Sequence, residues 1–232
     1  MHSKVKNRAE DKVKSIVEDK DPELVTKRRM QLVEAAIGQF SRVGYYVATI
    51  KDIADAAGVS AGLVYQYIPD KQDLLFLCLQ HIVERNKREI PAALEGVKDP
   101  LSRLVVAVES YTRVIAANRN AVLLTYRETK SLKPEYVALM KRMELDTNAL
   151  IAACVEDCVK AGYLIPTHIE LLVYRIITNA HAWALKYWRL RPIVTLNQYI
   201  ELSMHSCWMP LMTPSGQKRY DQIKNTSTKR KS

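Results

Sequence analysis

The stretch from Thr49 to Asp73 constrains this chain more than any other, because it contains two short helical runs separated by a tight reversal. Thr49 and Ser60 each precede one run, and a Thr or Ser hydroxyl at that position accepts a hydrogen bond from an otherwise unpaired helical N–H. Gly58 stands between the runs, where a reversal often demands a positive φ. The pattern predicts a helix-turn-helix.

Further side chains in and around this stretch favour the same interpretation. Ala54 is small, as the close approach of two helices requires, and Val59 has the size to fill the space between them. Phe40 and Leu74 frame the unit with apolar side chains. Each feature alone is common, and an ordinary helical hairpin is the alternative. The combination favours the helix-turn-helix, which is typical of proteins that bind DNA.

The remaining chain continues with helical spacing of apolar residues, with prolines near helix starts and glycines at helix ends. Only 7 of the 232 residues are glycine, so residues that favour turns are few. Hydrophobic residues make up 48% of the chain, which is enough to form a buried core. We predict an all-α protein with an N-terminal three-helix helix-turn-helix domain and a C-terminal bundle of six helices. The bundle helices are expected from residue 71 to about 90, from residue 100 onward, and at about 120–130, 134–161, 166–189 and 196–209.

Composition divides the chain into four segments. Residues 1–25 mix charges of both signs without a sustained apolar stripe, which predicts a flexible charged arm. Residues 26–72 form the helix-turn-helix domain, and residues 73–212 form the larger domain. Residues 213–232 are basic with few apolar side chains, which predicts a disordered tail.

The formal net charge of +10 suits a polyanionic partner such as DNA, although a basic protein without such a partner is the alternative. An anionic membrane surface would suit the charge too, and a membrane-surface protein is a further alternative. No apolar run reaches the roughly 20 residues of a membrane span. The charged N-terminus lacks the apolar stretch of a signal peptide. We therefore expect a cytoplasmic protein without a membrane partner.

Signatures of catalysis are missing from the sequence. We find no phosphate-binding glycine loop, no dinucleotide pattern, no H-E-x-x-H and no nucleophile elbow. The five histidines and four cysteines do not fall at metal-ligand spacings, and the cysteines are interpreted as reduced core residues. We predict that the protein is not an enzyme and holds no metal and no cofactor.

The helix-turn-helix resembles the N-terminal module of the tetracycline-repressor (TetR) family over about residues 27–76. The larger domain is similar to that family only in the number and length of its helices. The residues that carry the resemblance are Gly44-Tyr45-Tyr46, Thr49-Ile50, Ile53-Ala54, Gly58-Val59-Ser60, Leu63-Val64-Tyr65, Tyr67, Lys71 and Leu74-Leu75.

The resemblance implies that the helix opened by Ser60, Ala61 and Gly62 enters the major groove of DNA. Ala61 and Gly62 would permit close approach. Ser60 and Gln66 would donate or accept hydrogen bonds at base edges, and Leu63 or Tyr65 would meet a thymine methyl group. Phosphates would be held by Thr49, Tyr65, Tyr67 and Lys71. Tyr67 has a second interpretation as a core residue, and Lys71 as a solvated lysine.

The family also implies a homodimer on a palindromic operator, formed by the last two bundle helices. Residues 180–191, AHAWALKYWRLR, combine small and aromatic side chains, which suits a tight interface between helices. Packing inside one monomer is the alternative for these helices.

A small-molecule effector is the other partner that the family implies. Residues 125–135, TYRETKSLKPE, place three cations near a bend beside an apolar helix, which suits an acyl-coenzyme A thioester or a fatty or aromatic carboxylate. A solvated charged turn is the alternative interpretation. The expected pocket residues are Leu79, Val108, Tyr111, Tyr126, Arg127, Asn148, Asn179 and Trp183.

The resulting hypothesis is a dimeric repressor that the effector releases from DNA, with the helix from Lys71 to about Ile90 as the lever. One alternative is an architectural DNA-binding protein without an effector. Another is a helical enzyme that carries a vestigial DNA motif.

Overall fold

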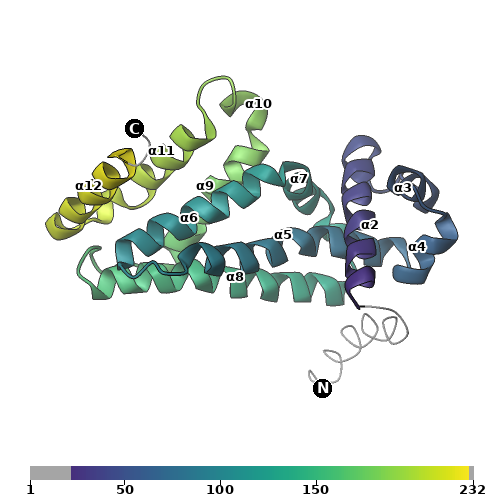
Figure 1. The fold of residues 1–232 in the computed structure, drawn as a ribbon, viewed down its shortest axis with the longest axis horizontal. Helices are drawn as coiled ribbons and strands as arrows, with labels where there is room; N and C mark the ends of the chain where they lie inside the picture. The colour runs from purple at the N-terminus through teal and green to yellow at the C-terminus, as the bar shows by residue number, and fades with distance from the viewer. Residues whose placement is uncertain (1–21, 230–232) are drawn as a thin grey trace, which may run out of the picture. The chain divides into compact units, whose positions relative to one another are not determined.

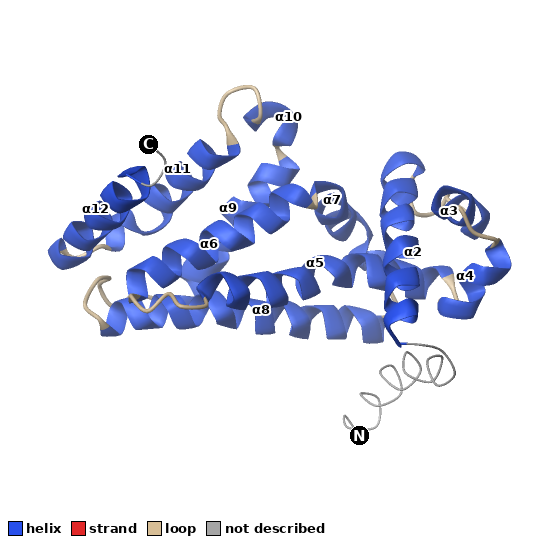
Figure 2. Cartoon of the chain, viewed as in Figure 1, coloured by secondary structure: helices blue, strands red, loops and turns tan. Residues whose placement is uncertain are grey.

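The computed structural model describes residues 22–229 of the chain, and in these residues every regular element is a helix (Figures 1 and 2). An isolated β-bridge joins Leu164 and Met212. The all-α prediction is confirmed. Most of the expected charged arm lies outside the described residues, and its last residues already belong to the first described helix, α2 (Pro22–Val43).

Two compact units make up the chain. Unit 1 comprises residues 1–82 and 120–142, and unit 2 comprises residues 83–119 and 143–232. Three helices contribute residues to both units: α5 (Lys71–Leu94), α7 (Arg119–Glu128) and α8 (Pro134–Lys160).

Unit 1 contains the helix-turn-helix, formed by α3 (Ile50–Ala57) and α4 (Ala61–Tyr67) packed on α2. The predicted caps are present: the Thr49 hydroxyl accepts from the Asp52 backbone N–H, and the Ser60 hydroxyl accepts from that of Leu63. Gly58 ends α3 with a φ of +67°, as the reversal demands. Phe40, Ile53, Val64, Leu74 and Leu75 are fully buried at the centre of this unit.

Unit 2 is a helical bundle around α6 (Pro100–Ala117), α9 (Ile169–Leu185) and α11 (Leu196–Trp208), which pack against one another. Asp99 caps α6 by accepting from the Ser102 N–H, with Pro100 in the first turn. Two short 3₁₀ helices, η1 (Thr129–Ser131) and η2 (Met209–Leu211), complete the two units.

The structure differs from the predicted helices in two places. The helix expected over 166–189 is divided at Lys186 into α9 and the short α10 (Tyr187–Leu190). The expected disordered tail instead forms α12 (Pro214–Lys229). Thr213 and Ser215 donate hydrogen bonds to the Gly162 carbonyl, Arg219 pairs with Asp99 at 2.9 Å, and these contacts hold α12 against unit 2.

Candidate nucleic-acid interface

Helix α4 divides its side chains between the core and the solvent. Val64 and Tyr67 are buried, whereas Ser60, Gly62, Tyr65 and Gln66 are exposed. Tyr65 has 55% of its surface accessible. The exposed face therefore offers hydroxyl, amide and aromatic groups to a partner outside the chain.

Gly62 lies on this exposed face, and the fold gives no reason for a glycine there. A β-carbon added at Gly62 would meet only the Ser60 hydroxyl oxygen, at an ordinary distance of 4.0 Å. The backbone of Gly62 does not have a positive φ. Glycine costs a helix about 1 kcal/mol relative to alanine, so its presence fits a surface that another molecule approaches closely.

The two sites predicted to hold phosphates beside α4 are exposed or half-buried helix starts. Thr49 begins α3, where its backbone N–H and hydroxyl both donate to Asp52. Lys71 begins α5, where its ammonium donates to the Tyr46 carbonyl at 3.3 Å and lies 4.8 Å from the centre of the Tyr45 ring. Burial lowers the pKa of Lys71, and the charge of Asp52 acts in the opposite direction. An ammonium has three donors, so the Tyr46 contact leaves capacity for a phosphate.

Tyr67 differs from the other predicted contacts. Only 6% of its surface is accessible, which fits the alternative that its ring packs in the core of unit 1. Ala61 and Leu63, which also belong to α4, are half-buried.

A polar cluster at the start of α5 was not anticipated from the sequence. Lys133, next to the start of α8, pairs with Asp70 at 2.8 Å and with Asp73 at 3.2 Å. The Tyr136 hydroxyl donates to Asp73, and its ring stacks on Phe76 with centroids 4.3 Å apart. We call Asp70, Asp73, Lys133 and Tyr136 the α5–α8 clamp. No local pattern predicts it, because the partners are some 60 residues apart in the chain.

Asp70 and Lys133 of the clamp have shifted pKa values for related reasons. Burial alone would raise the pKa of Asp70, but hydrogen bonds from Lys133 and from the Asp73 backbone bring it below its usual value. Burial alone would lower the pKa of Lys133, and its two aspartate partners raise it instead. The clamp is therefore charged on both sides around neutral pH.

A second contact reaches the loop before α3. The Tyr46 hydroxyl and the Ser131 hydroxyl of η1 are 2.9 Å apart, and Ser131 donates to the Glu128 carboxylate. The segment from Glu128 to Tyr136 therefore contacts both loops that border the candidate DNA surface. Ser131 contacts Tyr46 in the loop before α3, and Lys133 pairs with Asp70 in the loop before α5. The two loops also contact each other where Lys71 donates to the Tyr46 carbonyl.

The predicted pocket residues are divided between the two units. Leu79, Tyr126 and Arg127 belong to unit 1, and the other five belong to unit 2. Tyr126 is 55% exposed and Arg127 is exposed beside Glu128, so neither lines an enclosed cavity. Lys133, expected at a pocket mouth, is a clamp residue. In unit 2, Val108, Tyr111, Asn148 and Trp183 are buried, and Asn179 is half-buried with its amide on Cys207.

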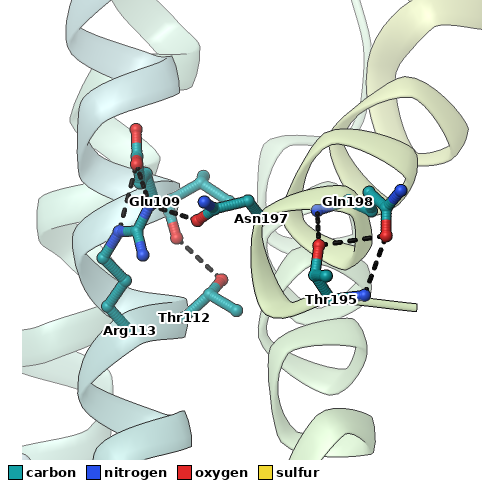
Figure 3. A network of polar contacts seen from close by, with 7 residues as sticks. Glu109, Thr112, Arg113, Thr195, Asn197 and Gln198 are labelled. Atoms are coloured by element: carbon teal, nitrogen blue, oxygen red, sulfur yellow. Dashed lines mark hydrogen bonds and ion pairs between the residues drawn. The ribbon is translucent and has the colours of Figure 1, made fainter. Parts of the chain in front are cut away.

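An open pocket of about 410 Å³ lies on unit 2 between α5 and α6, and none of the predicted pocket residues lines it. Its charges cancel in pairs, Arg113 with Glu109 at 2.6 Å and Arg85 with Glu89 at 3.7 Å. Figure 3 shows Arg113 reaching from Glu109 to Asn197 at the start of α11. The network fixes α11 beside α6, and the pocket offers no unbalanced charge to a ligand.

The comparison with known families decides what kind of protein has this architecture. Residues 32–78 match the model described as bacterial regulatory proteins of the tetR family, and residues 97–189 match the tetracyclin repressor-like C-terminal domain. The chain belongs to the TetR family. Members of this family are DNA-binding transcriptional regulators and not enzymes, which makes the exposed face of α4 the candidate DNA-binding surface.

Relatives of this TetR-family regulator agree with that assignment. The chain is 42% identical over 206 residues to the HTH-type transcriptional regulator HbdR of Aromatoleum sp. (strain CIB), covering 89% of each chain. It is 32% identical over 115 residues to the HTH-type transcriptional activator FasR of Mycolicibacterium smegmatis, over 50% of this chain and 52% of that one. A tetR-family regulatory protein from Rhodococcus RHA1 has a similar structure, with a TM-score of 0.67 and 25% identity over 78% of this chain and 97% of that one.

Two further features bear on the kinds of site that this regulator contains. Within residues 22–229, no helix combines the length and hydropathy needed to cross a membrane. The same residues contain no group of three or more His, Cys, Asp or Glu side chains placed to hold a metal ion. Four cysteines are buried, and none of them forms a disulfide: Cys78, Cys154, Cys158 and Cys207.

Proposed function

We propose that this regulator is a homodimeric repressor that a small molecule releases from a palindromic operator. The observation that carries the DNA-reading part is the exposed face of α4, above all the exposed Gly62 that the fold itself does not require. Repression is the family's usual mode, although FasR is named an activator, so the direction of control needs its own measurement.

The proposed DNA contacts follow from exposure. Ser60 and Gln66 read base edges, and Tyr65 or Leu63 meets a thymine methyl group. Thr49 and Lys71 hold phosphates at the two helix starts that border α4. Tyr65 supplements them through its hydroxyl. Tyr67 supports this surface from the core with its buried ring.

The proposed dimer uses the outward faces of α9 and α11. Leu171 and Leu202 are 60% and 61% exposed, and Tyr174 is exposed beside Leu171 on α9. Large apolar side chains on neighbouring helices mark surfaces that other proteins cover. A second copy of the chain supplies such a cover, and a two-fold dimer matches a palindromic operator. Trp183 is buried within unit 2, so it supports the interface from inside, unlike the exposed Trp188.

The proposed effector is a largely apolar molecule, an acyl-coenzyme A thioester or a fatty or aromatic acid, bound within unit 2. Support comes from the composition of that interior, which is almost entirely apolar. Helix α5 is the proposed lever, since it begins directly after α4 with Lys71 and continues into unit 2. The effector shifts DNA binding only by its different affinities for the bound and released states. Such a regulator acts in the cytoplasm.

The experiment begins with selection of binding sequences from a random DNA pool by the full chain. We expect enrichment of a palindrome with half-sites about one helical turn apart, or a multiple of it. Light scattering at micromolar concentration should show a dimer, free and on DNA. Enrichment without symmetry, or a monomer in solution, would contradict the dimeric proposal.

The architectural alternative is distinguished in the same assay. An architectural protein would bind DNA with little sequence preference and would not be released by any metabolite extract. Release of the selected DNA by an extract fraction supports the effector, and equal affinity with every fraction would support the alternative.

A further inference from the structure

The interior of unit 2 contains two amide groups with unsatisfied polar atoms. Asn86 on α5 and Asn148 on α8 are 2% and 7% exposed. The Asn86 Oδ1 and the Asn148 Nδ2 are buried without a hydrogen-bond partner in the described part of the chain. Buried polar atoms are nearly always hydrogen-bonded in folded proteins, so two such atoms in one interior require an explanation.

The two amides lie at the same level of the bundle. Lys87 follows Asn86 directly, Asp146 precedes Asn148 by two residues, and the Lys87 ammonium pairs with the Asp146 carboxylate at 3.1 Å. This ion pair places α5 and α8 side by side at these residues. The helical rise is 1.5 Å per residue, so both asparagines lie within one turn of the pair. Both side chains are buried and therefore turn inward from it.

Several other buried polar side chains of unit 2 have partners. Thr112 and Thr147 donate to the Val108 and Met143 carbonyls of their own helices. The Tyr111 hydroxyl and His181 Nε2 are 2.7 Å apart. Besides the two asparagine atoms, the Trp208 Nε1 and the Arg85 Nε are buried without a hydrogen-bond partner among the described residues, and Arg85 forms an ion pair with Glu89. The asparagines are the amide groups in this set, and an amide can serve as donor or acceptor.

The same interior lacks charge. Among the described residues of unit 2, no Asp, Glu, Lys or Arg side chain is buried. Burial lowers the pKa of His181 to about 4, so its imidazole is neutral at pH 7. A carboxylate transferred into this interior would lose its hydration without gaining a cationic partner, which is strongly unfavourable.

We propose that Asn86 and Asn148 recognise the effector, and that the part of the effector they contact is neutral and carries a carbonyl together with an N–H or a hydroxyl. A primary amide can present either its oxygen or its nitrogen, so the pair can meet both kinds of group. An amide with its N–H, or an ester or thioester that also carries a hydroxyl, satisfies this requirement, whereas a free carboxylate does not. The inference rests on the proposed effector response and narrows its ligand class.

The first test measures the stability of the ligand-free protein. Leucine has the same branching as asparagine and no polar atom, so N86L and N148L remove unsatisfied groups. Each should raise Tm by about 2–4 °C. The matched control is N179L, because the Asn179 amide has a partner in Cys207, and its removal should lower Tm. A fall in Tm for both N86L and N148L would mean that these amides are satisfied structural groups.

The second test uses two probes that differ in a single charge. N-phenyl-1-naphthylamine is neutral with one N–H donor, and 8-anilinonaphthalene-1-sulfonate is its sulfonated counterpart. We expect fluorescence titration to show saturable binding of the neutral probe, at least tenfold tighter than that of the sulfonate. Binding of the neutral probe should weaken about tenfold in N86A, because the Asn86 oxygen accepts from the probe's N–H. It should change little in N148A, because the probe has no carbonyl for the Asn148 nitrogen. Alanine cannot overpack the interior as leucine could.

The outcomes separate this inference from the proposed function. Equal or tighter binding of the sulfonate, no saturable binding of the neutral probe, or unchanged affinity in N86A would overturn the inference. Each variant is also titrated with the selected DNA. Retained DNA binding together with lost probe selectivity contradicts the ligand class alone, whereas absent DNA binding by the unmodified protein contradicts the proposed function.

Discussion

The helix-turn-helix of unit 1 and the interior of unit 2 treat their polar groups in opposite ways. In the helix-turn-helix, Thr49, Asp52 and Ser60 satisfy helix ends within three residues of themselves, and the groups left over face solvent. In unit 2, Asn86 and Asn148 are enclosed with atoms that nothing in the described chain satisfies. The first region is complete as folded and meets its partner with an outward face. The second has an interior that a partner would complete.

The two regions differ in how a bound partner would act on them. In the proposed function, DNA that contacts the exposed face of α4 replaces water, so contacts there would set affinity and register. A ligand that reaches the two asparagines would supply hydrogen bonds that the ligand-free protein lacks, and such differential contact is what a shift between two states requires.

Removal of a core side chain from unit 1 should have the largest effect. I53A deletes most of a fully buried side chain and should cost about 2–5 kcal/mol. The three tryptophans, Trp183, Trp188 and Trp208, all belong to unit 2, so their emission reports on that unit alone. We expect an early loss of helical circular dichroism and of DNA binding while tryptophan emission is unchanged.

The control for I53A is V47A, because Val47 is 71% exposed and its truncation should leave both signals as they are. Coincident unfolding curves by circular dichroism and tryptophan emission in I53A would show that the two units unfold together. The two units would then not differ in stability.

Substitution of Gly62 should change stability and DNA binding in opposite directions. G62A should stabilise the protein by up to about 1 kcal/mol in urea unfolding and weaken binding to the selected DNA about tenfold. The matched control is G38A, at an exposed position inside α2 that likewise has room for a β-carbon. It should stabilise equally and leave DNA affinity unchanged. If G62A binds DNA as tightly as the unmodified protein, DNA does not approach the α4 backbone closely at Gly62, and that part of the proposal is wrong.

Loss of Lys71 should weaken binding to every DNA sequence alike. K71A should reduce the slope of log K against log salt concentration by about 1, because one phosphate contact is lost. K71R keeps the charge and should keep the slope, which separates the phosphate contact from the packing of Lys71 on Tyr45. The exposed Lys160 of unit 2 supplies the control K160A. A loss confined to one operator variant would instead indicate base reading.

The α5–α8 clamp should have the smallest effect on stability and a characteristic pH dependence. K133M should cost less than about 1 kcal/mol at pH 7, because its ion pairs are partly exposed. Asp70 has a lowered pKa when folded, so its contribution is present above the unfolded value of about 3.9 and is lost as pH falls through the lower folded value. The stability difference between K133M and the unmodified protein should therefore disappear in acid.

Lys133 sets the alkaline limit of the same effect. Its pKa is raised, so its contribution is present below the unfolded value of about 10.4 and is lost as pH rises through the folded value. Urea unfolding from pH 3 to pH 8 measures the acid limb, with K141M at an exposed lysine of α8 as the control. A difference that stays constant down to pH 3 would argue against the ion pair with Asp70.

Sequence reasoning succeeded where the determining contacts are local. The caps at Thr49 and Ser60, the positive φ of Gly58 and the buried faces of α3 and α4 all depend on residues within a few positions of one another. It failed at α12, whose basic composition predicts a disordered tail. That helix depends on the Arg219–Asp99 pair and on the close approach of Gly216 to the Tyr163 carbonyl, partners that are distant in the chain.

The candidate sites divide along the same line. The sequence predicted a DNA-binding surface whose side chains are exposed on α4, and it placed Asn148 among the pocket residues, but Tyr126 and Arg127, which it assigned to the pocket, are exposed. It assigned no role to Asn86, because an asparagine on a helix gives no sign of whether its amide will find a partner.

The sequence by itself determined the helix-turn-helix, since helix caps, turn glycine and apolar spacing are short-range signals that act before any tertiary contact forms. Only the tertiary structure decided which charges pair and which polar atoms are buried without partners. Lys133 became a clamp residue and Asn86 an unsatisfied interior amide because burial and pairing depend on helices that the chain brings together from far apart. Desolvation is a property of the packed interior, and no stretch of sequence carries it alone.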